Sequence, residues 1–309
     1  MKKAMLFCCA LAIPLLAQPL PQGEVASNNL AFHLYQTGRY NEAEALLSRI
    51  IDRLPDRTVA HLNYADVLSK MEQTDQNNRD RAGMHYLTYI AQMLYDKKGS
   101  RIPERLRGTY ADSFPLLDAL NGILKEKYVV LKEARGDLDA DGTEDRSLVV
   151  ALADRDKVDD QEGMEMRAPD RNQRIWFVWL GGTDGYKLIG KNGAIIPSDE
   201  YTHCDDPLDA ISMKRNSLYL ETHYWCSAGG WGQGNATVQF LYRDGALLLA
   251  GKEESHDSRA TGEGEMISTN YLSGRQKVQR TVDHGDPEGA PVWRRLKNAK
   301  PLYFDDVAE

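Results

Sequence analysis

Residues 137–145 gather oxygen-bearing side chains within a nine-residue segment, DLDADGTED. Asp occupies positions 1, 3, 5 and 9 of this segment, Gly occupies position 6 and Thr occupies position 7. Ca²⁺ prefers such oxygen ligands, and the glycine permits the tight turn that gathers them. Carboxylates this close repel one another unless a cation lies among them. The sequence therefore predicts a structural Ca²⁺ site whose ligands are Asp137, Asp139, Asp141, Thr143 and Asp145.

The segment that follows this loop has the pattern of a buried strand. Residues 147–152 are apolar and rich in β-branched residues. An EF-hand is disfavoured, because position 12 is Leu148 where a bidentate glutamate belongs and no helix follows. The loop-then-strand order resembles the calcium sites of FG-GAP (integrin-type) and thrombospondin type-3 repeats. That resemblance implies an ion that organises the strands behind the loop.

A second acidic run comes after this strand. A weaker cation site and a solvated hairpin loop both remain open as interpretations, and the solvated loop is the commoner structure for such a run. Its acids are Asp154, Asp156, Asp159, Asp160 and Glu162.

The second half of the chain, residues 128–309, has the pattern of an antiparallel β meander. Apolar and polar residues alternate over 218–224, which is typical of a half-buried strand, and turn signals such as Asp244-Gly245 separate the candidates. We expect blade-like or sandwich sheets without parallel crossovers. The predicted strands are 128–131, 148–152, 175–180, 186–189, 210–213, 218–224, 237–242, 246–250, 266–271 and 278–281.

The order of motifs in this half carries a wider resemblance. The loop at 136–145, the aromatic strand at 176–179, the hairpin at 185–188 and the turn at 242–245 follow one another. This order is similar to FG-GAP/VCBS-type β modules of exported bacterial proteins. One calcium loop is too few for a closed seven-bladed propeller, so an open assembly of sheets is expected.

Residues 24–126 are predicted to be helical and to begin with a repeat. Asn29-Leu30-Ala31 recurs as Asn63-Tyr64-Ala65, a spacing of 34 residues. Gly38 and Pro55 would end the two helices of the first unit. The pattern resembles tetratricopeptide repeats over about 70 residues, or one and a half units. This resemblance implies α-hairpins with a concave surface for a peptide, and the whole chain is predicted to be an α+β protein of two domains, 24–126 and 128–309.

The first 17 residues have the pattern of a secretory signal peptide. Lys2 and Lys3 precede a short apolar core, and small residues surround a cleavage site near Ala17. The predicted location is the periplasm or the extracellular space. Beyond this segment we expect no membrane span, because no other stretch is apolar for the ~18 residues that a span requires.

Composition and cysteine usage agree with export. Removing residues 1–17 takes away two lysines and no acids, which moves the formal charge from −8 to −10. A chain this acidic is a poor partner for nucleic acid. Two cysteines remain, Cys204 and Cys226, and an even pair in an exported chain predicts one disulfide, with two buried thiols as the alternative.

Two hypotheses about function come from these features. His223, Trp225 and Trp231 flank a glycine-rich loop and form a possible binding loop, although aromatics buried in the sheet would give the same pattern. We expect a non-enzymatic module that recognises a protein or peptide partner, for example a periplasmic inhibitor or immunity protein. The alternative is a periplasmic hydrolase acting on cell-wall material through Glu221 and His223 or through the Asp cluster.

The histidines of the helical region are expected to be packing or surface residues: His33, His61 and His85.

Overall fold

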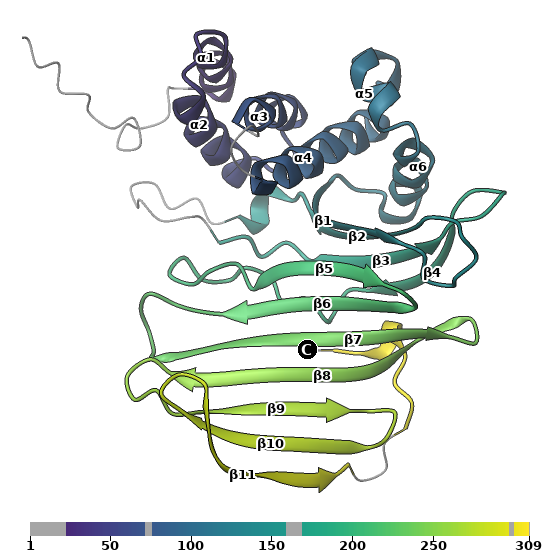
Figure 1. The fold of residues 1–309 in the computed structure, drawn as a ribbon. Coiled ribbons are helices and arrows are strands. Elements are labelled where there is room, and N and C mark those ends of the chain that lie inside the picture. The colour runs from purple at the N-terminus through teal and green to yellow at the C-terminus, as the bar shows by residue number, and fades with distance from the viewer. Residues whose placement is uncertain (1–22, 72–75, 159–168, 297–299, 309) are drawn as a thin grey trace, which may run out of the picture.

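The chain folds into helices followed by two antiparallel sheets, stacked as three layers (Figure 1). The computed structural model describes residues 23–71, 76–158, 169–296 and 300–308. The predicted α+β class, with helices first and antiparallel sheets after them, is confirmed. The predicted signal peptide, residues 1–17, lies outside the described residues.

The helical layer is built from amphipathic helices that pack against their neighbours in sequence. Gly38 ends the first helix with φ +77°, a conformation that favours glycine. Ala31 and Ala43 are fully buried where the first two helices meet, because small side chains permit a close approach. The helices are α1 (Glu24–Gln36), α2 (Tyr40–Arg53), α3 (Thr58–Met71), α4 (Gln76–Tyr95), α5 (Glu104–Thr109) and α6 (Ser113–Leu124).

The small sheet has four strands and the large sheet has seven, and each is a meander of neighbours in sequence. Neither sheet closes on itself. The small sheet contains β1 (Tyr128–Gly136), β2 (Asp145–Leu152), β3 (Arg174–Leu180) and β4 (Lys187–Asn192). The large sheet contains β5 (Leu208–Lys214), β6 (Ser217–Tyr224), β7 (Gly232–Arg243), β8 (Ala246–Ser258), β9 (Gly264–Asn270), β10 (Arg275–Val282) and β11 (Asp286–Arg295).

The small sheet lies between two hydrophobic cores, which explains its continuous apolar strands. Val150 and Phe177 point toward the helices and belong to the core shared with α1–α6. Their neighbours Val149 and Trp176 point the other way and pack against the large sheet. A strand buried on both faces is mostly apolar, and residues 148–152 of β2 have that pattern.

The segment after β11 returns to close the core between the two sheets. Phe304 is almost completely buried, and its ring packs edge-on against Trp176 and Phe240, each at 5.0 Å between ring centroids. The backbone N–H of Leu249 donates to the carbonyl of Leu302 at 2.8 Å, which ties this segment to β8. Asn192 donates a hydrogen bond to the carbonyl of Phe304.

The strand at residues 286–295 was not predicted, and β7 and β8 extend beyond their predicted bounds. Pro287 and Pro291 argue against a strand in this segment, because proline cannot donate a ladder hydrogen bond. The structure places β11 at the edge of the large sheet, where proline is tolerated. Ten of the strands therefore follow from the sequence pattern, and the eleventh is an edge strand whose composition conceals it.

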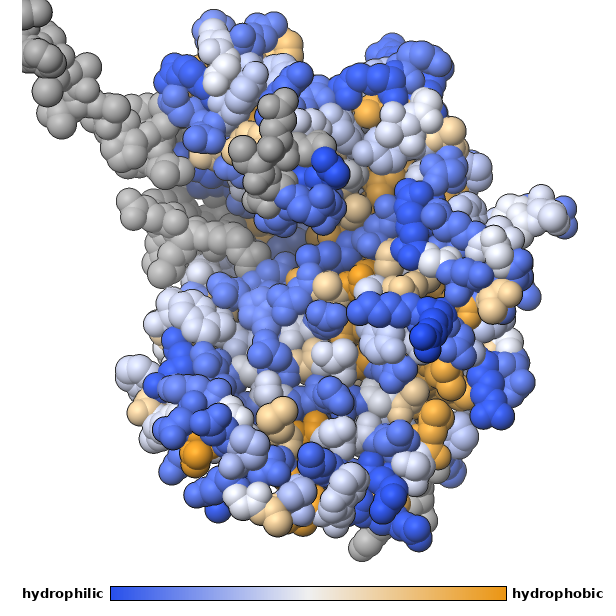
Figure 2. Space-filling view, viewed as in Figure 1, coloured by the Kyte–Doolittle hydropathy of each residue, from blue (hydrophilic) through white to orange (hydrophobic). Residues whose placement is uncertain are grey.

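The surface seen in Figure 2 is mainly hydrophilic, and hydrophobic side chains appear there in small groups. Among the described helices, none combines the length and apolar character that a membrane crossing requires.

Candidate functional site

The predicted calcium loop connects β1 to β2 and brings three of its five predicted ligands together. Carboxylate oxygens of Asp137, Asp139 and Asp145 lie within 4.8 Å of one another. Asp141 is exposed, and its Oδ1 accepts a hydrogen bond from the backbone N–H of Thr143 at 2.6 Å. The loop therefore gathers three carboxylates, while Asp141 and Thr143 shape its turn.

Backbone N–H groups hold the carboxylates of this loop in place. Oδ2 of Asp137 accepts from Gly142 at 3.0 Å, where φ is +86°. Asp145 accepts from Leu138 at 2.6 Å and from Gly181, the residue after β3, at 2.7 Å. Each oxygen that accepts one hydrogen bond keeps a second lone pair for a cation. The donor set therefore fits Ca²⁺, with water and backbone carbonyls available for the rest of its shell of six to eight oxygens.

Asp145 is the carboxylate that most needs compensation. Its burial raises the pKa of this carboxyl above the ordinary value, and the negative charge of Asp139 adds to the rise, while hydrogen bonds from Leu138 and Gly181 lower it. A Cβ on Gly181 would lie 2.3 Å from the carbonyl oxygen of Glu144, so glycine is required for this approach. A cation among the three carboxylates would favour the ionised form of Asp145.

The second acidic run is only partly within the described residues. Asp154 caps the short 3-10 helix η4 (Arg155–Lys157), because its Oδ1 accepts from the backbone N–H of Asp156 at 3.0 Å. Asp159, Asp160 and Glu162 lie outside the described residues. The carboxylate of Asp154 thus stabilises a local turn.

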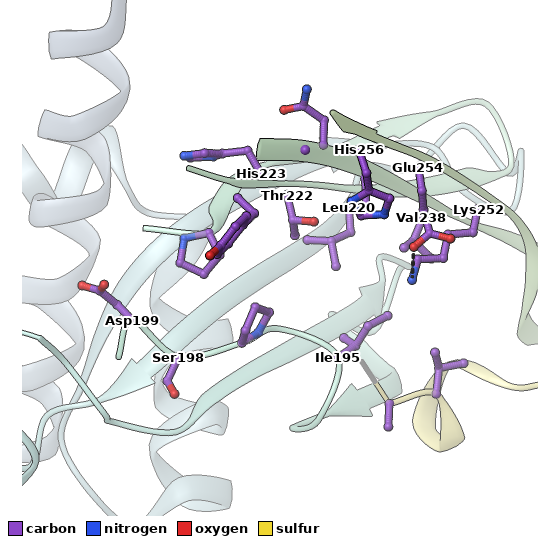
Figure 3. A pocket seen from close by; sticks show the side chains of 18 of the residues that line it. Ile195, Ser198, Asp199, Leu220, Thr222, His223, Val238, Lys252, Glu254 and His256 are labelled. Atoms are coloured by element: carbon purple, nitrogen blue, oxygen red, sulfur yellow. Dashed lines mark ion pairs between the residues drawn. The ribbon is translucent and has the colours of Figure 1, made fainter. Parts of the chain in front are cut away.

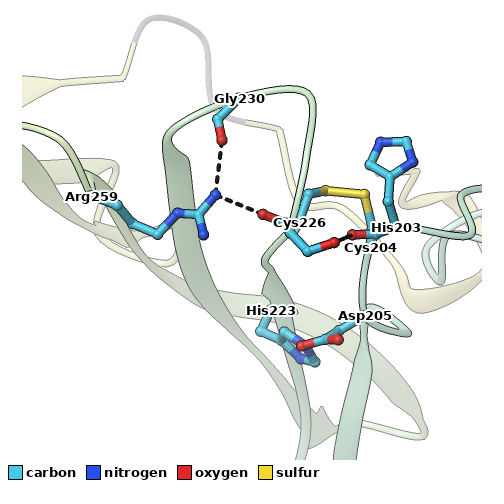
Figure 4. The surroundings of a disulfide bond; sticks show 8 residues. His203, Cys204, Asp205, His223, Cys226, Gly230 and Arg259 are labelled. Carbon is cyan, nitrogen blue, oxygen red and sulfur yellow. Dashed lines mark hydrogen bonds and ion pairs between the residues drawn. A yellow bond between two sulfur atoms is a disulfide. The ribbon is translucent and has the colours of Figure 1, made fainter.

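Cys204 and Cys226 form the predicted disulfide (Figure 4), 22 residues apart in sequence. The two residues pair as an isolated antiparallel bridge. Hydrogen bonds flank it, from Asp205 N–H to the Trp225 carbonyl at 3.0 Å and from Ser227 N–H to the His203 carbonyl at 2.7 Å. The disulfide joins the segment before β5 to the end of β6.

The glycine-rich loop after Cys226 is fastened by Arg259. The guanidinium of Arg259 donates to the carbonyls of Cys226 and Gly230 at 2.6 and 2.8 Å (Figure 4). It also lies 5.0 Å from the ring centroid of Trp225 and 6.0 Å from that of Trp231. Trp231 is 67% exposed, so it is not buried in the sheet. The two tryptophans form one surface with Arg259 and are not among the residues that line the hollows described below.

His223, the third residue of the predicted binding loop, lines the first hollow, unlike the two tryptophans, and has acids near both ring nitrogens. Its Nδ1 lies 2.6 Å from Asp209 Oδ1, and its Nε2 lies 3.6 Å from Asp205 Oδ2. Both ring nitrogens thus face carboxylates. Glu221 is exposed on β6 and is not among the residues that line the hollows.

A groove crosses one face of the large sheet and consists of two adjoining hollows. The first hollow has a volume of about 810 Å³, and its walls come from residues 195–207 and 302–308. The second has a volume of about 530 Å³, and Tyr224 and His256 line both. Figure 3 shows Leu220 and Val238 beside Lys252, Glu254 and His256 in the first hollow.

Strand register explains why one face of the sheet supplies this groove. Leu220 pairs with Val238, and Val238 pairs with Lys252, so the three side chains share a face. Two residues further along, Thr222 pairs with Ala236 and Ala236 pairs with Glu254. Lys252, Glu254 and His256 were not predicted, because residues 252–258 are polar on both faces of β8 and have no apolar alternation to indicate a strand.

A second feature that the sequence did not reveal is a histidine pair between α3 and α4. His61 is fully buried, and its Nδ1 lies 3.0 Å from Nδ1 of His85. Nε2 of His61 lies 2.8 Å from the Pro55 carbonyl, which can only accept, so Nε2 carries the proton and Nδ1 accepts from His85. Burial lowers the pKa of His61 to about 4, and burial together with the charges of His61 and Arg81 lowers that of His85 well below its ordinary value. His33 is exposed, as predicted.

No protein-family model, no curated protein and no solved structure matches this chain.

Proposed function

We propose that this protein is an exported, calcium-stabilised binding module that holds an extended segment of a protein or peptide partner on its large sheet. The observation that carries the proposal is the continuity of the two hollows across β6–β10. The first hollow alone has the volume of a ligand site, and the second prolongs it. An apolar floor with polar sides suits a segment whose side chains alternate.

The large sheet is a better candidate for this role than the helical layer. Helix α4 packs on β1, and the helices share one hydrophobic core with the small sheet. The helical layer therefore uses much of its apolar surface internally. In this proposal, the tetratricopeptide-like hairpins support the β layers, and the sheet contacts the partner.

The alternative, a hydrolase acting on cell-wall material, has less support. A general base needs a ring nitrogen within reach of the proton that it abstracts. Asp209 lies 2.6 Å from Nδ1 of His223, and Asp205 lies 3.6 Å from Nε2, an arrangement that a general base could also have. Glu221 is exposed and does not line the groove with His223. This position of Glu221 favours binding over catalysis.

Filling the groove is expected to abolish recognition. Ala236 lies within the first hollow, so Ala236→Trp would occupy it, whereas Thr237→Trp places the same side chain on the opposite face of β7. Peptides selected from a random displayed library on the unaltered protein should bind with micromolar Kd and lose at least about tenfold in affinity on Ala236→Trp. Thr237→Trp should leave their binding unchanged. A selection that yields no binding peptide, or equal losses in the two variants, contradicts the proposal.

Calcium is proposed as the structural ion of the loop at 137–145. Asp139→Asn removes one charged ligand and should weaken Ca²⁺ binding at least about tenfold, measured by isothermal titration calorimetry. The matched control is Asp154→Asn, which alters a turn carboxylate outside the loop. Added Ca²⁺ should raise the Tm of the unaltered chain and of the control, because an ion that binds only the folded state stabilises it. No heat of binding, with no change in Tm, would remove calcium from the proposal.

A further inference from the structure

The two hollows of the groove carry a large excess of negative charge. Five acidic side chains line the first hollow, against one lysine: Asp199, Glu200, Asp205, Glu254 and Asp306. Four line the second, against one arginine: Asp257, Glu263, Glu265 and Glu288. A concave surface whose charges have one sign concentrates their electric field on a ligand that enters it.

The two permanent cations of the groove offset only part of this excess, and each lies beside acids of the groove. Nζ of Lys252 lies 3.0 Å from Glu254. Arg280 pairs in register with Glu265 on β9 and with Glu288 on β11, so it lies between two acids on the same face of the sheet. Charge remains on exposed carboxylates of both hollows, including Glu200, Asp306 and Glu263.

The neutral parts of the groove also suit a cation with an apolar stem. Leu220, Val238 and Leu249 supply buried apolar surface in the first hollow. Tyr201 and Tyr224 also line it and are 58% and 57% exposed, so their ring faces can receive an ammonium or guanidinium group. Lysine and arginine combine these properties, since their methylene stems pack on apolar surface while their charged ends reach polar groups.

From these observations we infer that the groove recognises an extended basic segment, a stretch of a partner chain in which lysine or arginine alternates with apolar residues. This inference rests on the proposed function and names the partner's chemistry. Apolar side chains pack on the floor, and the basic side chains reach the acidic walls. Tyr224, at the junction of the two hollows, contacts the segment where it passes from one hollow to the other.

The test uses the full chain and three labelled peptides of about eight residues, long enough to follow a strand. One alternates lysine with leucine, the second has glutamine for lysine, and the third has glutamate for lysine. Fluorescence anisotropy should show the lysine peptide binding at least about tenfold more tightly than the glutamine peptide, with the glutamate peptide weakest. The preference should shrink as salt is added, because exposed charges are screened.

Two double variants test whether the preference for the lysine peptide arises in the groove. Glu200→Gln with Asp306→Asn removes two carboxylates from the groove, whereas Glu221→Gln with Glu253→Gln removes two from the opposite face of the same sheet. Both change the net charge equally. Only the groove variant should weaken binding of the lysine peptide, by about fivefold or more, while binding of the glutamine peptide stays unchanged in both.

Four other experimental outcomes would contradict the inference of a basic segment. If the lysine and glutamine peptides bind equally, the inference that the segment is basic is wrong, while the proposed function stands. Equal weakening by the two double variants shows attraction to net charge alone and overturns the inference. If micromolar spermidine displaces the lysine peptide, the groove binds a small cation, and the inference that it recognises a peptide segment is wrong. If no peptide binds, the inference and the proposed function both fail.

Discussion

Replacing Glu133 by alanine is expected to lower the free energy of unfolding by about 3 kcal/mol, because it leaves a buried guanidinium short of a counter-charge. Arg146, on β2, is completely buried. Its Nη2 donates to Glu133 on β1 and to Ser113 Oγ, and its Nη1 donates to Asp112 at 2.8 Å. Asp112 would remain in the variant as a partner of Arg146. The expected loss of unfolding free energy is therefore at the lower end of the range that is usual when one partner of a buried ion pair is removed.

Urea denaturation measures this loss, and a surface pair provides the control. Glu144 lies 3.2 Å from Arg135, and both side chains are substantially exposed, so Glu144→Ala should cost less than about 1 kcal/mol. Replacing Glu133 by leucine together with Arg146 by methionine removes both charges and should recover most of the loss. Equal effects of Glu133→Ala and Glu144→Ala would show that the buried network contributes no more than a surface pair.

Acidification from about pH 7 to about pH 4 is expected to remove about 3 kcal/mol of stability through His61 alone. The pKa of His61 falls from 6.5 to about 4 on folding, mainly because burial disfavours the charged ring, and Lys127 adds to the fall. The Pro55 carbonyl and Asp56 oppose it. Between these two values the unfolded chain binds more protons than the folded chain, so stability is complete above pH 6.5 and is lost as the pH falls toward 4.

His85 acts in the same direction and Asp145 acts in the opposite one. Protonating His61 at Nδ1 would set its new N–H against the N–H of His85. The raised pKa of Asp145 makes its contribution more favourable as the carboxyl becomes protonated, so the histidine effect is obtained as the difference between the unaltered chain and a His61 variant, in which Asp145 is the same.

The histidine effect is checked by urea denaturation across this pH range. His61→Gln should flatten the dependence of unfolding free energy on pH, because glutamine can still donate to the Pro55 carbonyl but does not titrate. His33→Gln replaces an exposed histidine of the same layer and should preserve the dependence. If the unaltered chain and His61→Gln lose equal stability on acidification, the assignment to this pair is wrong.

Local patterns in the sequence predicted much of the fold. Gly38 and Pro55 mark the ends of α1 and α2, and the alternation in 218–224 marks β6. The apolar run after the acidic loop at 137–145 is a strand buried on both faces. The pattern failed at Pro287 and Pro291, because a proline that forbids a central strand is acceptable at an edge. The likenesses to tetratricopeptide and FG-GAP repeats remain predictions.

The sites were less predictable because their parts come from distant segments. Asp137, Asp139 and Asp145 are close in sequence, and their grouping was predicted. His61 and His85 are 24 residues apart and meet only when α3 packs on α4. The walls of the groove come from residues 195–207 and 302–308, which have no periodic pattern to indicate where they lie.

The position of Phe304 has a consequence for how the molecule assembles during synthesis. This ring fills the space between Trp176 and Phe240, which belong to different sheets. Residue 304 is synthesised after the strands of both sheets, so the two sheets cannot enclose their common interior until this segment is available. The helices and the small sheet can form earlier, because their contacts are more local. The groove, one wall of which is made by residues 302–308, therefore forms only after the strands of both sheets have been synthesised.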